Sequence, residues 1–150
     1  MSVATMGQFL HYFDVFEKAL ESEDWTNVAE CFAEDARYTV EGVPFACHIE
    51  GRQPIIEAFK RSTKNFDATM DTRILDIQSM FRLSPDCVRV ELISGYGRAS
   101  VGGITAPVAT EVTTSEHGIV ALRDIYDPAL TSPALTWLAT HMSDADPSYV

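Results

Sequence analysis

The chain has 150 residues, and its 22 acidic side chains against 11 lysines and arginines give a formal net charge of −11. The length suits one domain with a sizeable core, which we assign to residues 1–150. The acidic balance excludes the clustered basic surface that nucleic acids and anionic membranes require, so we expect neither as a partner. The hydrophobic fraction of 46% excludes intrinsic disorder.

The cysteines and the amino-terminal residues indicate a compartment. Cys31, Cys47 and Cys87 are odd in number and widely spaced, which fits neither a disulfide framework nor a zinc motif. Residues 1–6 have no basic segment of a signal peptide, and no run approaches the ~18 apolar residues of a membrane span. We therefore expect a cytoplasmic protein, and we expect neither a metal nor another cofactor.

The first half of the chain is predicted to be mainly helical. A helix over 6–21 follows from apolar side chains at a spacing of three and four residues, and a shorter one follows Asp24. A β-rich stretch at 37–40 comes next, and Pro54 opens a third helix that reaches about Lys64. The apolar side chains of the second helix are Trp25, Val28, Ala29 and Phe32.

The second half is predicted to be a sheet. Four β-rich runs at about 69–81, 87–99, 104–115 and 118–127 are separated by turn residues, which is typical of an antiparallel meander. A short helix over 134–141 closes the fold, and residues 143–150 are expected to fray. Helices first and a sheet afterwards indicate an α+β fold, in which about three helices cover one face of a curved sheet around a pocket.

Three stretches of the sequence resemble the nuclear-transport-factor-2-like superfamily, in its SnoaL-like and limonene-epoxide-hydrolase-like branch. They are residues 31–38 (CFAEDARY), 48–55 (HIEGRQPI) and 118–127 (GIVALRDIYD). The resemblance implies a cone-shaped, mixed but mostly antiparallel sheet with a central pocket. Ketosteroid isomerases of this superfamily use a Tyr and two Asp at positions that hold Phe16, Val40 and Thr110 here, so their activity is not implied.

The epoxide-hydrolase pattern is matched in part. The resemblance assigns the family's Arg-x-Asp pair to Arg89 and Glu91, its last-strand acid to Asp124, and its tyrosine to Tyr38. It implies that Arg89 bridges two carboxylates, with Glu91 as base, Asp124 as acid or orienting group, and Tyr38 as a donor to water or substrate.

Strand alternation alone, without the family resemblance, also singles out Asp124 as a candidate functional residue. Strand alternation places it on the face of Val120, Leu122 and Tyr126, where a carboxylate is costly unless it is paired or protonated. Desolvation there raises a pKa toward the range useful for acid–base catalysis. The alternative is a structural carboxylate that backbone amides or an arginine satisfy.

Arg89 and Glu91 leave the same side of their strand, and two interpretations stay open. Alternation alone favours Val88, Val90 and Leu92 in the core, with Arg89 and Glu91 in solvent. The resemblance favours the pocket instead.

A small, mostly apolar molecule is the expected ligand. We expect it to contact Phe16, Trp25, Phe59, Leu122 and Tyr126. The leading hypothesis is a cofactor-free hydrolase, isomerase or cyclase that uses acid–base chemistry. The alternatives are a non-catalytic ligand-binding or assembly domain and a small subunit that docks on a larger enzyme. An apolar outer sheet face, which three helices cannot also cover, predicts a homodimer.

Overall fold

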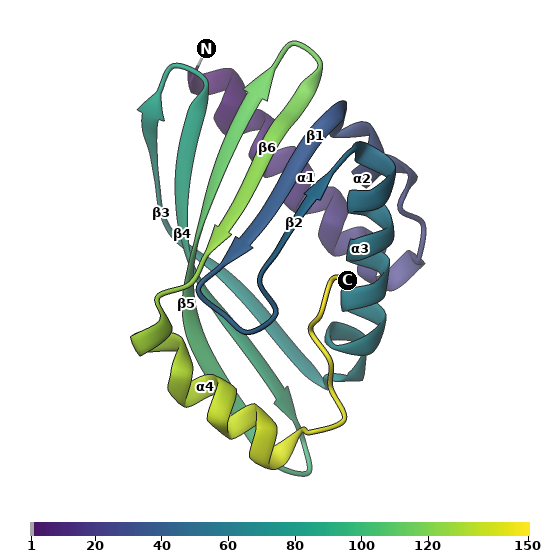
Figure 1. Ribbon diagram of the computed structural model, residues 1–150, viewed down its shortest axis with the longest axis vertical. Coiled ribbons are helices and arrows are strands. Elements are labelled where there is room, and N and C mark those ends of the chain that lie inside the picture. The colour runs from purple at the N-terminus through teal and green to yellow at the C-terminus, as the bar shows by residue number, and fades with distance from the viewer. Residues whose placement is uncertain (1) are drawn as a thin grey trace.

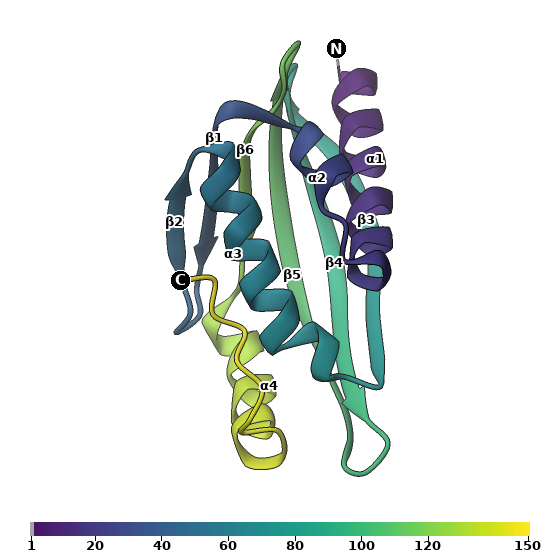
Figure 2. The ribbon, with the colours of Figure 1, turned by 90° about the vertical axis from the view of Figure 1, so that its right-hand side faces the viewer.

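The computed structural model describes residues 2–150, and it describes side chains from Thr5 onward. Helices α1 (Ser2–Ser22), α2 (Thr26–Glu30) and α3 (Arg52–Asn65) lie on one face of a curved sheet (Figures 1 and 2). A single turn of 3-10 helix, η1 (Asp67–Thr69), follows α3. None of the helices in this described part has the length and apolar character needed to cross a membrane.

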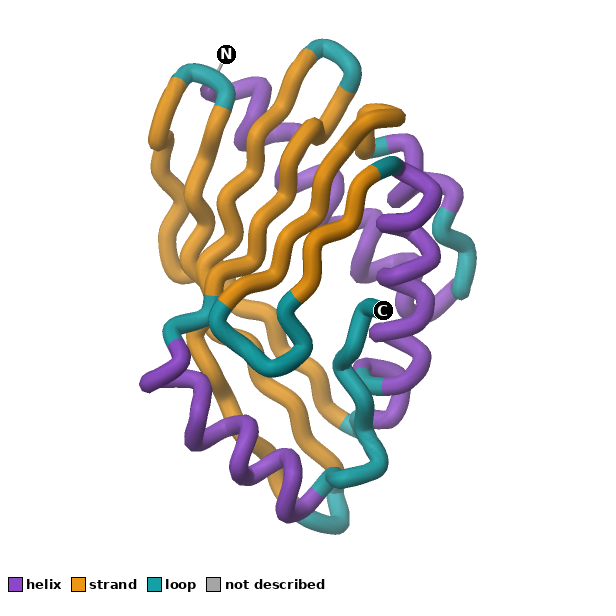
Figure 3. The backbone as a smooth tube through the Cα atoms, in the orientation of Figure 1, coloured by secondary structure: helices purple, strands orange, loops and turns teal. Residues whose placement is uncertain are grey.

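Six strands form one mixed sheet in the order β2-β1-β6-β5-β4-β3, as the tube view in Figure 3 makes visible. Only β1 and β6 run parallel, and the other neighbours are antiparallel. The α+β fold and the four-stranded meander predicted from the sequence are therefore confirmed. The strand bounds are Phe32–Glu41 (β1), Cys47–Glu50 (β2), Thr72–Ser84 (β3), Cys87–Arg98 (β4), Gly102–Ser115 (β5) and Gly118–Ile125 (β6).

The start of β1 differs from the expectation. Phe32 was expected on the face of the second helix, but α2 ends at Glu30 and Phe32 already belongs to β1, where it is fully buried. The short strand β2 was not predicted, because four residues carry too little alternation to stand out. It pairs with β1 through the register Tyr38↔Ile49.

Alternation divides the sheet into two chemically different faces. The inner face, under the helices, carries buried side chains such as Tyr38, Val90, Val112 and Leu122. The outer face was expected to be apolar, and this is wrong for its centre. A ladder of charges crosses it there, with ion pairs Arg89–Glu111, Arg123–Glu111 and Arg123–Glu41.

The carboxyl-terminal part begins with α4 (Pro128–His141), six residues before the expected helix. Asp127 caps it by accepting a hydrogen bond from the amide of Ala129 at 2.9 Å. Its contacts with the sheet are mainly to β5. From α4 the chain returns along α3 (Figure 2).

Residues 143–150 do not fray as expected. Ser62 on α3 donates a hydrogen bond to the Pro147 carbonyl at 2.8 Å, and Arg98 forms an ion pair with Asp144 at 2.9 Å. Tyr149 packs against the hydrophobic core. The segment forms neither helix nor strand, yet these contacts fix its position.

Candidate functional site

A cavity of about 110 Å³ lies between the helices and the inner face of the sheet. Aromatic rings dominate its wall, and they come from α1, α3, strands β1 and β4, the residue after β6 and the carboxyl-terminal segment. They are Phe9, Tyr12, Phe13, Phe16, Tyr38, Phe59, Tyr96, Tyr126 and Tyr149. A second cavity of about 70 Å³ under α4 shares Tyr96, Tyr126 and Tyr149 with the first. The space suits a small organic molecule, since cavities of this order hold benzene-sized ligands.

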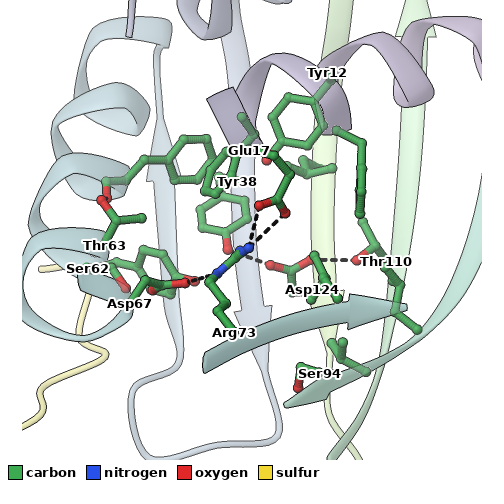
Figure 4. Close-up of a pocket in the computed structure, with 18 of the residues that line it drawn as sticks. Tyr12, Glu17, Tyr38, Ser62, Thr63, Asp67, Arg73, Ser94, Thr110 and Asp124 are labelled. Atoms are coloured by element: carbon green, nitrogen blue, oxygen red, sulfur yellow. Dashed lines mark hydrogen bonds and ion pairs between the residues drawn. The ribbon is translucent and has the colours of Figure 1, made fainter. Parts of the chain in front are cut away.

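Asp124 on β6 supplies a carboxylate to this wall (Figure 4). The register pairs it with Val40 on β1 and Thr110 on β5, so all three lie on the inner face. Tyr38 donates its hydroxyl hydrogen to Oδ2 at 2.5 Å, and Thr110 donates to Oδ1 at 2.8 Å. Among the described residues no cationic side chain forms an ion pair with Asp124.

The pKa of Asp124 is raised. Burial is the main cause, because it disfavours the charged form, and the hydrogen bonds from Tyr38 and Thr110 offset only part of it. Each carboxylate oxygen can accept more than one hydrogen bond, so both keep acceptor capacity beyond these bonds. Asp124 can therefore exchange a proton with a bound molecule.

Tyrosine hydroxyls are the neutral donors of the cavity. Burial is the largest influence that raises the pKa of Tyr12, Tyr38 and Tyr126, and the nearby charge of Asp124 raises each further. These hydroxyls therefore stay protonated at physiological pH. Tyr38 donates its hydrogen to Asp124, whereas Tyr12 and Tyr126 can donate hydrogen bonds to a substrate oxygen.

A charged cluster occupies another part of the wall. Arg73 on β3 donates from Nη1 to both carboxylate oxygens of Glu17 on α1, at 2.8 and 2.6 Å. Its Nε donates to Asp67 at 2.5 Å. Burial raises the pKa of Asp67, although Arg73 opposes that shift. Figure 4 shows Arg73 between Glu17 and Asp67, with Asp124 beyond it.

Comparison with known proteins gives likeness in structure alone. No family model matches the sequence, and no curated protein matches it. Many solved structures do match. One is a protein from Rhodopseudomonas palustris named as a candidate isomerase, with a TM-score of 0.67 and 15% identity over 86% of this chain and 96% of that chain.

Two further matches carry the name of the fold. An NTF2-like protein from Burkholderia thailandensis has a TM-score of 0.64 and 16% identity over 87% of this chain and 96% of its own. A Catenulispora acidiphila protein with a ketosteroid isomerase-like fold, in complex with trimethylamine, has a TM-score of 0.60 and 18% identity, covering 79% and 87%. This chain has the nuclear-transport-factor-2-like fold.

Within this fold, the predicted trio of Arg89, Glu91 and Asp124 does not come together. Arg89 pairs in register with Glu111 and forms an ion pair with it at 2.9 Å on the outer face. Glu91 is exposed and accepts a hydrogen bond from Ser79 there. The sheet itself separates both from Asp124. Arg89 therefore bridges no pocket carboxylate, and Glu91 is excluded as the base.

Four of the five residues predicted to contact a ligand lie in the wall of the cavity. Phe16, Phe59, Leu122 and Tyr126 line the cavity, whereas Trp25 does not. Trp25 is 7% exposed and packs edge-on against Phe16 at 5.2 Å between ring centroids, so it supports the wall from behind.

The lining residues that the sequence analysis did not single out include Glu17, Asp67, Arg73, Tyr96 and Tyr149. Arg73 and Tyr96 face each other across β3 and β4, so strand alternation, followed from Leu75, carried a signal for Arg73. Tyr149 had no such signal, because it lies in a segment without periodicity.

Proposed function

We propose that this protein is a SnoaL-like small-molecule enzyme that moves a proton with Asp124 and needs no cofactor for that step. The observation that carries the proposal is a desolvated carboxylate on the wall of an aromatic cavity, held by two neutral hydroxyls. A carboxylate with a raised pKa is a stronger base than an ordinary one, so it takes a proton from a carbon acid more readily.

The chemistry fits an isomerisation best. Asp124 takes a proton from a carbon next to a carbonyl, the electron pair moves onto the carbonyl oxygen, and a tyrosine hydroxyl stabilises that oxyanion by donating a hydrogen bond. Asp124 then returns the same proton to another carbon. One carboxylate suffices for both halves of this step.

Epoxide hydrolysis has less support. It calls for one group to activate water and another to protonate the epoxide oxygen, and the second carboxylate expected for it, Glu91, lies on the outer face. Val40, next to Asp124 in the register, offers no polar atom to hold a water. These two positions favour proton transfer within a substrate over attack by water.

The substrate must be small and mostly apolar, because rings supply most of the wall and the cavity measures about 110 Å³. The Catenulispora protein, which has a similar fold and is in complex with trimethylamine, supports a ligand of small size.

The test is proton exchange in deuterium oxide. Small ketones are incubated with the protein, and loss of the signal from the protons next to the carbonyl is followed by nuclear magnetic resonance. We expect the wild type to accelerate the exchange and Asp124→Asn to slow it by at least about 100-fold, the usual contribution of a positioned acid–base group.

Glu91→Gln is the matched control, since it makes the same carboxylate-to-amide change on the outer face. It should exchange like the wild type. An Asp124→Asn protein that folds and retains full activity would refute the assignment.

A binding protein without turnover is the second candidate. Val40 favours it, because an apolar side chain stands beside Asp124 where a catalytic site of this fold carries a polar one. In that case a ligand binds to the wild type, and no ketone in the panel exchanges faster with protein than without it.

A further inference from the structure

The electrical character of the cavity bears on the kind of molecule it takes. Of the described residues that line it, three carry carboxylates and one carries a guanidinium: Glu17, Asp67, Asp124 and Arg73. Arg73 is shared between Glu17 and Asp67, so its charge is already matched. Asp124 is left with hydroxyl partners only. The wall therefore carries an excess of negative charge.

The rings add to this preference. The face of an aromatic ring has a partial negative charge, and it attracts a cation within about 6 Å of its centre. Tyr38, Phe59 and Tyr149 pack edge to face, with Tyr38 at 5.0 Å from Phe59 and 5.3 Å from Tyr149 between centroids. These three rings gather beside Asp124, because Tyr38 bonds to it directly.

We propose that the natural substrate is a small organic cation, such as an amine with a compact apolar body. This inference concerns the same cavity and rests on the proposed function. An anion would meet three carboxylates, and a neutral molecule would leave the charge of Asp124 uncompensated in a desolvated place. A cation meets both the carboxylate and the rings.

The same charge serves the proton transfer. When ionised Asp124 takes a proton from the carbon next to the carbonyl of a ketone that also carries an ammonium group, the C–H bond breaks, an O–H bond forms, and the electron pair moves onto the carbonyl oxygen. Asp124 becomes neutral and the substrate becomes a zwitterion, in which the ammonium charge offsets the new oxyanion, so the net charge in the cavity does not change. A cation therefore suits the reaction as well as the wall.

Three probes of one shape test the inference: tert-butylammonium, tert-butanol and trimethylacetate. Their dissociation constants for the wild-type protein are measured by calorimetry or ligand-observed nuclear magnetic resonance at pH 8. We expect the ammonium to bind about ten-fold more tightly than the alcohol, which corresponds to 1.4 kcal/mol. We expect trimethylacetate to bind more weakly than both.

Asp124→Asn should reduce the preference for the ammonium to within about three-fold, since about half of the 1.4 kcal/mol is then lost. Glu91→Gln should keep the full preference. The comparison of probes on the wild type stands even if Asp124→Asn fails to fold.

Binding of the alcohol or of trimethylacetate as tightly as the ammonium overturns the inference, and so does an absence of binding by all three probes. If the alcohol binds best while Asp124→Asn still loses exchange activity, the ligand class is wrong and the proton-transfer function stands. If the ammonium binds as expected and Asp124→Asn keeps its exchange activity, the ligand class is right and the proton-transfer function is wrong.

Discussion

Asp124 and Asp67 are two buried aspartates of one cavity, and their surroundings give them different roles. Asp67 has Arg73 at 2.5 Å, and that guanidinium opposes the rise in its pKa. Asp124 has only hydroxyl donors, which stabilise a carboxylate less than a full positive charge does. Asp67 therefore helps to hold α1, η1 and β3 together through Arg73, while Asp124 is the group to which we assign the proposed proton transfer.

The raised pKa of Asp124 makes the protein's stability depend on pH. An unfolded Asp titrates near about 3.9, so between that pH and the higher folded value the folded chain holds more protons. The contribution of Asp124 to the free energy of unfolding is therefore fully present below the unfolded pKa, and it is lost as the pH rises through the pKa of the folded state. The titratable groups whose pKa the charge of Asp124 helps to raise are Tyr12, Tyr38, Cys47, Tyr96, Tyr126 and Tyr149.

The free energy of unfolding of Asp124→Asn should therefore increase relative to that of the wild type as the pH rises from about 4.5 to 8. The expected increase is about 1.4 kcal/mol for each unit by which the pKa of Asp124 is raised. Urea unfolding at both pH values measures the free energy. Glu91→Gln, on an exposed side chain, should stay within about 0.5 kcal/mol of the wild type. If the difference in free energy of unfolding between Asp124→Asn and the wild type does not change with pH, or changes in favour of the wild type, the raised pKa of Asp124 is contradicted.

Residue positions on strands were predictable where alternation was followed strictly. It placed Asp124 with Leu122 and Tyr126 on the inner face, as the structure does. It also favoured the solvent for Arg89 and Glu91, and the family resemblance argued wrongly for the pocket. A motif transfers the order of residues along a strand, whereas the side of the sheet follows from the register of its neighbours.

At the scale of elements, the connection between β1 and β2 fixes the end of β6. Gly42 has a φ of 84°, and a Cβ there would lie 1.9 Å from the carbonyl oxygen of Tyr126. The amide of Tyr126 in turn donates to the Glu41 carbonyl at 3.0 Å. The turn thus packs closely against the backbone of Tyr126, whose side chain lines the cavity.

Gly42→Ala should lower the free energy of unfolding by at least about 2 kcal/mol, because it adds both backbone strain and a clash. It should also weaken probe binding, since Tyr126 has to move. The control is Gly7→Ala in α1, where a Cβ meets no atom within 4 Å and should raise stability by up to about 1 kcal/mol. Equal denaturation midpoints for the two variants would contradict this explanation.

Elements with a strong period were predictable, and those without one were not. Four long strands and the helices α1 and α3 carried clear alternation or a stripe of apolar side chains. The four residues of β2 and the segment around Tyr149 are ordered by contacts with distant parts of the chain, such as the bond from Ser62 to Pro147. Only the folded structure brings these partners together, so the place of Tyr149 in the cavity wall had no local signature.

For the whole molecule, the surface combines a net charge of −11 with apolar side chains around the charged ladder of the outer face. Ile74, Phe81 and Leu130 are each more than 40% exposed. The register places Phe81 beside Arg89, and Leu130 lines the same outer groove. These side chains support the association of two copies through the outer face. The apolar contacts would lie around the charged centre of this face, whereas the sequence had predicted an apolar centre.

We predict a homodimer at micromolar concentration whose dissociation constant falls as salt is added, because salt screens the repulsion between two acidic subunits. Sedimentation equilibrium at low and high salt measures it. Phe81→Asp should shift the protein toward the monomer, while Glu91→Gln should not. A monomeric mass at both salt concentrations rules the dimer out.

The single parallel pair of strands also bears on how the chain folds. β3 to β6 can pair one after another through short turns, but β1 has to wait for β6, its only parallel partner. The hydrogen bond between Tyr38 and Asp124 connects β1 with β6 and closes a loop across 86 positions of sequence. Closing so long a loop is slow in entropic terms, and it follows the local pairings. We therefore expect the proposed proton-exchange site to be assembled in one of the last folding steps.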